Sequence, residues 1–122
     1  MLYTIGYQKI TAEQLIDILA GYGVDTLVDV RSRPYTSKKG FHRRELEKTL
    51  PERGITYCWA GDRLGGFGRI TETAIFELAG FVRDRTVCLM CMEADPDQCH
   101  RKTEIARRLA ACNVAAHHLI ID

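Results

Sequence analysis

The chain has 122 residues and a formal net charge of +1, and 46% of its residues are hydrophobic. This hydrophobic content excludes a disordered chain, and the length suits a single domain over residues 1–122. No apolar run approaches the roughly 20 residues of a transmembrane helix, and the opening residues MLYTIGYQ do not resemble a signal peptide. We therefore expect a cytoplasmic protein with no membrane partner, whose five cysteines are thiols.

Strand and helix patterns alternate along the chain. Thr11 and Gln14 form a capping box before an apolar helical stripe, and the unbroken apolar run Val87–Met90 is typical of a strand covered on both faces. In chain order we predict strands at residues 2–6, 26–31, 55–59, 86–91 and 114–121, helices at 11–21, 43–50, 71–82 and 95–112, and loops at 32–40 and 61–68.

This alternation predicts an α/β fold with three layers, in which a mostly parallel sheet of about five strands has helices on both faces. Right-handed crossovers would bring every loop that leads from a strand to a helix to one edge of the sheet. Ligands bind at that edge in open α/β folds, so we expect the functional site there.

The stretch Thr86–Arg101, TVCLMCMEADPDQCHR, gathers reactive side chains at one of these strand ends. Asp95 and Pro96 predict a helix start, which leaves Cys91 at the end of a strand and Cys99 in the first helical turn. A thiol near a helix N-terminus can ionise below the ordinary pKa of about 8.5 and become a nucleophile. A buried, inert thiol is the alternative for Cys91, and it is the favoured interpretation for Cys58, Cys88 and Cys112.

Other side chains predicted at this edge complete a candidate site. The catalytic candidates are Cys91, Glu93 and His100, of which the last two could move a proton. Asp29 shares a strand face with Arg31 and must be paired if it is buried, so we expect Asp29 and Tyr7 to support the site. The substrate-binding candidates are Arg31, Arg33, Arg63, Gly65, Gly66, Cys99 and Arg101.

A metal site is disfavoured by the spacing of the possible ligands. Cys91, Glu93, Cys99 and His100 are ligand types, but the spacing is not a standard zinc pattern. Neighbouring helical residues also diverge by about 100°, so Cys99 and His100 would not readily share one ion. We expect no metal and no other cofactor.

Residues 31–53 carry eight basic and three acidic side chains, a local excess of five positive charges. A solvated helix face is one explanation. The other is an attractive field for an anion, either a small oxyanion near Arg31 and Arg33 or the phosphates of a nucleic acid.

Several of these motifs together resemble the family catalogued as domain of unknown function 488. The matching residues are TIGY at 4–7, LVDVRS at 27–32, Pro34, Phe41, GI-x-Y at 54–57, LGG at 64–66 and C-x-E-x-x-P-x-x-CHR at 91–101. The resemblance extends over nearly the whole chain and implies the fold and the location of a site, but no activity. The family typically has His-Ser where this chain has Tyr7-Gln8. A looser similarity links the chain to rhodanese-type and cysteine-phosphatase domains, which also end a central strand on a cysteine.

The leading hypothesis is a small cysteine-dependent enzyme that acts on an anionic substrate containing sulfur or phosphate. The alternative is a nucleic-acid-binding module that uses residues 31–53, with the cysteine loop in a structural role.

Overall fold

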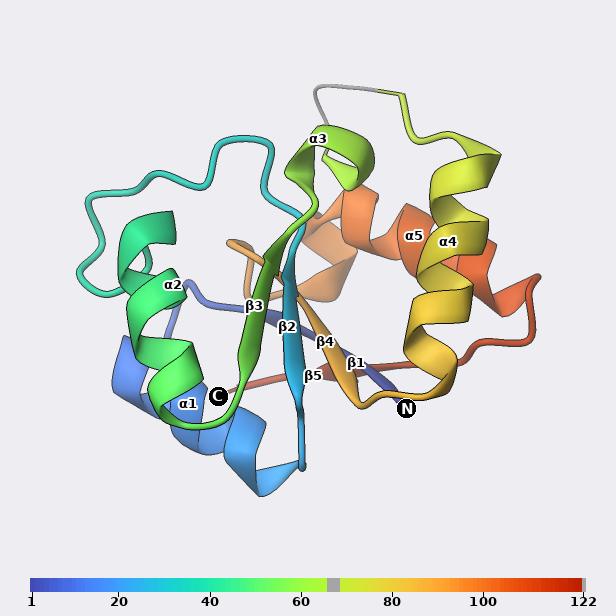
Figure 1. Cartoon of the computed structure of the whole chain (residues 1–122). Coiled ribbons are helices and arrows are strands. Elements are labelled where there is room, and N and C mark those ends of the chain that lie inside the picture. The colour runs from blue at the N-terminus through green and yellow to red at the C-terminus, as the bar shows by residue number, and fades with distance from the viewer. Residues whose placement is uncertain (66–68, 122) are drawn as a thin grey trace.

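The structure, a computed structural model, describes residues 1–65 and 69–121, and of residues 100–103 it describes the backbone alone. Five parallel strands form one sheet in the order β3-β2-β4-β1-β5, as Figure 1 shows. The strands are β1 (Leu2–Gly6), β2 (Thr26–Asp29), β3 (Thr56–Trp59), β4 (Val87–Cys91) and β5 (Ala116–Leu119). The helices are α1 (Ala12–Gly21), α2 (Arg43–Glu52), α3 (Gly61–Leu64), α4 (Glu72–Arg83), α5 (His100–Ala110) and a 3₁₀ turn at Pro96–Gln98.

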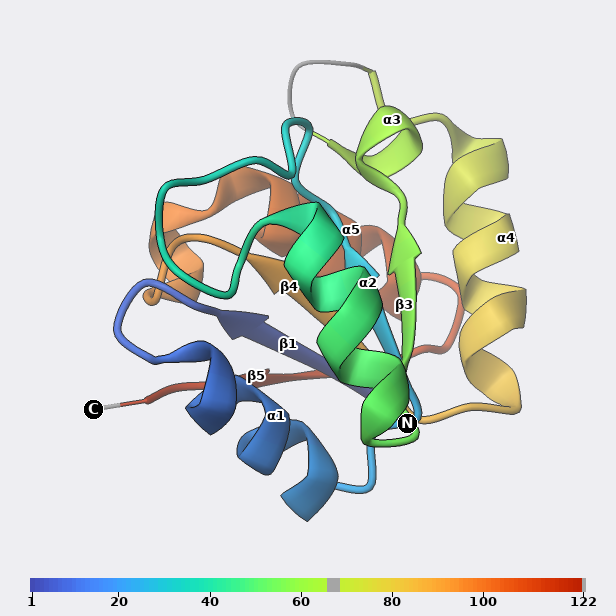
Figure 2. The same ribbon diagram turned by 60° about the vertical axis from the view of Figure 1, so that its left-hand side comes forward.

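Helices cover both faces of the sheet, which confirms the predicted α/β layers. Helices α1 and α2 lie on one face, and α4 and α5 lie on the other (Figures 1 and 2). The side chains of β4 alternate between the two cores: Val87 and Leu89 belong to the core under α4 and α5, while Cys88 and Met90 belong to the core under α1 and α2. Because β4 is central and covered twice, every residue of the strand is buried.

The order of the strands creates a crevice at the carboxyl end of β4. The chain leaves β1 and β2 toward α1 and α2, but it leaves β4 toward α5 on the opposite face. The loop after β4 therefore diverges from the loops after β1 and β2, its two neighbours in the sheet. This divergence is the topological switch point at which α/β sheets bind ligands.

The predicted capping residues mark the helix starts, except that α5 begins later than expected. The predicted capping box is present, because the Gln14 amide donates to Thr11 Oγ1 at 3.1 Å and the Thr11 amide donates to Gln14 Oε1 at 2.9 Å. The expected helix at 95–112 instead begins at His100. Asp95 accepts a hydrogen bond from the Asp97 amide at 2.9 Å and caps the 3₁₀ turn, so Cys99 precedes α5 rather than lying within its first turn.

Three further expectations were wrong. Residues 61–64 form the short helix α3 instead of a loop. Cys58 is exposed rather than buried, because β3 is an edge strand and α4 does not cover it. Phe76, expected to face the core, is 63% exposed, since the buried stripe of α4 runs through Ile75, Leu78, Ala79 and Val82 and leaves the position after Ile75 at its margin. In the described part of the chain, no helix is both long and apolar enough to cross a membrane.

Candidate functional site

The end of β2 holds a buried ion pair. Asp29 is fully buried and accepts three hydrogen bonds from Arg31: from Nε at 2.8 Å, from Nη2 at 2.7 Å and from the backbone amide at 3.1 Å. Tyr57 of β3 donates a fourth to Asp29 Oδ2 at 2.6 Å. All the acceptor positions of the carboxylate are thus used, and the expected pairing of Asp29 with Arg31 is present.

These contacts shift two pKa values. Burial alone would lower the pKa of Arg31, but the hydrogen bonds and the charge of Asp29 outweigh it and raise the pKa above the ordinary guanidinium range. Burial, with the hydrogen bond to Asp29, raises the pKa of Tyr57 well above that of an ordinary phenol. Arg31 therefore stays charged and Tyr57 stays protonated at any physiological pH.

Tyr7 extends this network to the end of β1. Its hydroxyl accepts a long 3.5 Å hydrogen bond from Nη1 of Arg31, the guanidinium nitrogen that Asp29 does not engage, and its ring stacks on Phe41 with centroids 4.4 Å apart. Lys38 donates from Nζ to the carbonyls of Tyr7 and Gln8, each at 2.8 Å. Tyr7 thus contacts Arg31 from the end of β1, and Lys38 links the loop after β2 to the loop after β1.

The loop after β4 is tied to the loop after β1. The Tyr7 amide donates to the Cys91 carbonyl at 3.1 Å, and the Gln8 amide donates to the Met92 carbonyl at 2.9 Å. Gly6 permits this approach, because a Cβ at that position would overlap the backbone carbonyl of Glu93. The path of the loop, and hence the position of Glu93, depends on the absence of a side chain at residue 6.

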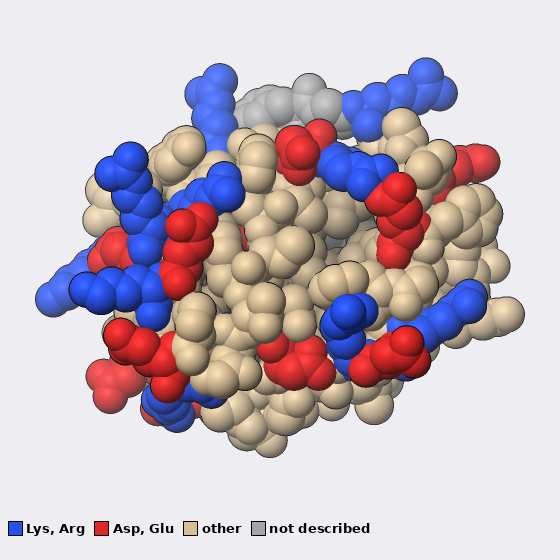
Figure 3. Space-filling model, viewed as in Figure 1, with Lys and Arg blue, Asp and Glu red and all other residues tan. Residues whose placement is uncertain are grey.

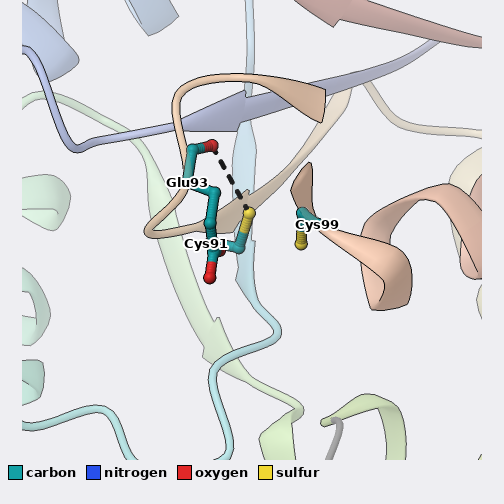
Figure 4. Close-up of side chains that lie close together, drawn as sticks. All are labelled: Cys91, Glu93 and Cys99. Atoms are coloured by element: carbon teal, nitrogen blue, oxygen red, sulfur yellow. Dashed lines mark hydrogen bonds between the residues drawn. The ribbon is translucent and has the colours of Figure 1, made fainter. Parts of the chain in front are cut away.

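Cys91, Glu93 and Cys99 lie together at this crevice, as Figure 4 shows. Cys91 ends β4, Cys99 is the N-cap residue of α5, and each is 4% exposed. The Cys91 thiol makes a long 4.0 Å contact with the backbone carbonyl of Glu93, drawn as the dashed line. Although the two cysteines lie eight positions apart in sequence, the 3₁₀ turn brings the second one back beside the first.

A cleft of about 210 Å³ opens over this cluster. It is lined by Tyr7, Val30, Arg31, Ser32, Arg33, Tyr35, Thr36, Cys91, Met92, Glu93 and Cys99. The ends of β1, β2 and β4 all contribute, so the cleft occupies the predicted edge of the sheet. Sequence reasoning missed Tyr35 and Thr36, although their place in the loop after β2 could have indicated them.

The cluster also has the composition of a metal site. The Sγ atoms of Cys91 and Cys99 and a carboxylate oxygen of Glu93 lie within 4.8 Å of one another. The spacing argument against a metal concerned Cys99 with His100, and this donor set does not need His100. Among the described residues it supplies three donors, one fewer than a closed zinc site.

Some predicted site residues lie elsewhere. Arg63 forms an ion pair with Glu77 and does not line the cleft. Gly65 packs against Ser32, whose Oγ a Cβ at Gly65 would overlap, so it stands behind the cleft wall. Gly66 lies outside the described residues, as do the side chains of His100 and Arg101.

Arg63 and Glu77 border a second, mostly apolar hollow of about 140 Å³ between β3 and α4. Figure 3 shows this recess with charged groups on its rim. Its lining includes Cys58, Leu78 and Phe81, but its guanidinium and carboxylate, those of Arg63 and Glu77, pair with each other, and its described lining has one cysteine where the crevice at β4 has two.

Three of the eight basic side chains in residues 31–53 form the ion pairs that follow. Arg31 pairs with Asp29, Arg43 pairs with Glu47 at 2.6 Å, and Arg53 approaches Asp17 at 3.5 Å. Figure 3 shows acidic and basic side chains interspersed around α2. On this face the segment is a mixed surface rather than a continuous basic track.

Comparison with known proteins gives a family and no activity. The model of the family described as Domain of unknown function DUF488 matches residues 11–73, just over half of the chain. Neither the curated proteins nor the solved structures gave a match. The matched part contains β2 with Asp29 and Arg31, α2 and β3, which are one wall of the cleft and its support. The chain belongs to the DUF488 family.

Proposed function

We propose that the cleft is the active site of a cysteine-dependent enzyme that acts on a small anionic substrate. One observation carries the proposal: the Sγ atoms of Cys91 and Cys99 and a Glu93 carboxylate oxygen lie within 4.8 Å of one another beneath a cleft that Arg31 and Arg33 also line. Nucleophile, proton acceptor and cation are the parts that covalent catalysis on an anion requires.

Each described residue has a distinct role in this scheme. Cys91 attacks as a thiolate, and Glu93 takes up the thiol proton. Arg33, exposed at the rim, attracts the anion, while Nη1 of Arg31 is held toward Tyr7 by the Asp29 pair and offers a fixed donor. His100 and Arg101 keep the roles that the sequence predicts, as a proton carrier and an anion-binding group.

Two alkylating agents of nearly equal size test the scheme because they differ in charge. Iodoacetate is an anion and iodoacetamide is neutral, and both label thiolates. We expect Cys91 to favour iodoacetate over iodoacetamide about tenfold more than the exposed Cys58 of the same protein does, the lower end of electrostatic steering. Peptide mass spectrometry gives the rate at each cysteine.

Matched variants locate the source of the preference. Arg33→Gln should reduce the preference for iodoacetate, and Arg44→Gln, on the exposed surface of α2, should not. Sulfate should slow the labelling of Cys91 and leave Cys58 unaffected. Equal preference at Cys91 and Cys58 would remove the anionic substrate from the proposal, and absence of Cys91 labelling would remove the nucleophile.

Nucleic-acid binding through residues 31–53 would show a different dependence. Phosphate contacts give a steep loss of affinity with salt, which a salt titration with single- and double-stranded oligonucleotides measures directly. The ion pairs of Arg31, Arg43 and Arg53 favour the small anion over this alternative.

A further inference from the structure

Two buried thiols line the same cleft, and their closeness indicates which class of substrate the cleft accepts. Cys91 and Cys99 are each 4% exposed, both line the cleft, and their Sγ atoms lie within 4.8 Å. A disulfide requires an S–S distance near 2.05 Å. Cys99 lies between the 3₁₀ turn and α5, so disulfide formation would require this connection to move toward Cys91.

A phosphate ester would gain little from such a site. Attack on phosphorus leaves a phosphorylated cysteine that water removes, and a second thiol has no part in that step. Phosphoryl transfer also depends on cationic groups that stabilise the transferred group. Among the described cleft residues, Arg31 is neutralised by Asp29, and Arg33 shares the cleft with the carboxylate of Glu93.

Exchange between a thiol and a disulfide needs what the cleft does contain. It requires one thiolate to attack a sulfur atom, a group that accepts the proton, and a second thiol within reach of the first. It adds no further negative charge to the site. As in the proposed function, Arg33 at the rim attracts the carboxylate of an anionic disulfide.

We propose that Cys91 and Cys99 act as an attacking and resolving pair, and that the substrate class is an anionic disulfide. This inference rests on the proposed function, because it takes Cys91 as the nucleophile. Glu93 then acts a second time, because it accepts the proton of Cys99 once Cys91 has been converted to the mixed disulfide.

The two steps balance without an external oxidant. In the first, the Cys91 thiolate attacks one sulfur of the substrate RS–SR, a Cys91–SR bond forms, and the leaving RS⁻ takes the Cys91 proton back from Glu93 and departs as RSH. In the second, Glu93 accepts the proton of Cys99, the Cys99 thiolate attacks Cys91 Sγ, the Cys91–Cys99 bond forms, and the second RS⁻ takes that proton and departs as RSH. The substrate has then gained two electrons and the protein has lost them. A dithiol reductant closes the cycle by the reverse exchange.

Glutathione disulfide, an anionic disulfide that carries several carboxylates, is the probe. The exposed Cys58 and the half-buried Cys112 lie outside the cleft, and replacing both with serine removes background exchange. In this parent, with a chelator present throughout to strip any cation from the three donors, we expect about two equivalents of glutathione released per chain. The intact mass should show no attached glutathione.

The single variants separate the two thiols. Cys99→Ser should release about one equivalent and retain glutathione on Cys91, and Cys91→Ser should react at least about tenfold more slowly than the parent. Circular dichroism of each variant confirms folding before the assay. As a control at an exposed site, Cys58 is restored in the parent. This protein should carry one stable glutathione adduct, located on Cys58.

The outcomes distinguish this inference from the proposed function. If Cys99→Ser still releases two equivalents, or if the parent stops at a stable Cys91 adduct, the resolving role of Cys99 is refuted and Cys91 remains the nucleophile. If Cys91→Ser reacts as fast as the parent, both proposals fail. Hydrolysis of a phosphate monoester that needs Cys91 and not Cys99 would overturn the substrate class alone.

Discussion

The ends of β2 and β4 are neighbours in the sheet and differ in how their polar groups are used. At β2, Asp29 accepts four hydrogen bonds and the charge of Arg31 is matched within the protein. At β4, the described hydrogen bond of Cys91 is a long 4.0 Å contact to a backbone carbonyl. The first strand end is therefore a hydrogen-bonded support, and the second carries the thiol to which we assign the chemistry.

Removing the carboxylate of Asp29 should have the largest effect on stability. Asp29→Asn leaves the Arg31 guanidinium buried without its counter-charge, which we expect to cost about 3–5 kcal/mol of unfolding free energy. Urea unfolding followed by circular dichroism measures this loss. Asp17→Asn, which removes the exposed partner of Arg53, should change stability by no more than about 1 kcal/mol.

A second substitution sharpens this prediction. In the double variant Asp29→Asn with Arg31→Met the unpaired charge is gone, so the double variant should be more stable than Asp29→Asn alone. A double variant that is less stable by the sum of both single losses would mean that the pair does not act as one buried unit.

Gly6→Ala should affect the β4 end while leaving the β2 end intact. The added Cβ would overlap the Glu93 carbonyl, so the loop must move, at an expected cost of about 1–3 kcal/mol. Alkylation of Cys91 should change in the same variant. Gly80→Ala, in α4 where a Cβ meets nothing within 4 Å, should instead stabilise the protein by about 0.5–1 kcal/mol. If both substitutions had the same small effect, Gly6 would not determine the path of the loop.

Tyr57→Phe should have the smallest effect on stability of these substitutions, and that effect should depend on pH. Burial and the hydrogen bond to Asp29 raise the pKa of Tyr57 above its ordinary value of 10.0, so the folded chain keeps a proton that the unfolded chain releases. Stability that is fully present below pH 10 is therefore lost as pH rises further.

In Tyr57→Phe this additional loss above pH 10 should disappear, at the cost of about 1 kcal/mol at neutral pH. Thermal melts across alkaline pH compare the two proteins. Tyr35→Phe, at a residue that is 62% exposed, should follow the wild type. An identical alkaline slope in Tyr57→Phe and wild type would contradict the assigned role of the Asp29 contact.

Local patterns predicted much of this architecture. The capping box of Thr11 and Gln14 and the apolar run of β4 depend on neighbouring residues only, and both were confirmed. The predicted start of α5 was wrong because Asp95, which is followed by proline, caps a 3₁₀ turn instead of the α-helix. The side-by-side placement of Asp29 and Arg31 followed from strand periodicity and needed no tertiary information.

The features that the sequence did not predict depend on contacts between residues far apart in the chain. The exposure of Cys58 depends on strand order, which the sequence does not contain. Lys38 binds two carbonyls that are 30 and 31 residues away in sequence, and Arg63 meets Glu77 across two helices, so neither partner could be read from spacing. Whether Cys91 and Cys99 would meet depended likewise on the turn between them, which a pattern search would have assigned to α5.

Mapping the cysteine linkage after exposure to glutathione disulfide tests the central claim most directly. The wild-type chain, with all five cysteines, is treated, blocked with an alkylating agent, digested without reduction and analysed by mass spectrometry. We predict a peptide pair joined through Cys91 and Cys99, with Cys88 recovered as a buried, unmodified thiol. Recovery of Cys99 as an alkylated thiol beside a glutathione adduct on Cys91, or modification confined to the exposed Cys58, would contradict it.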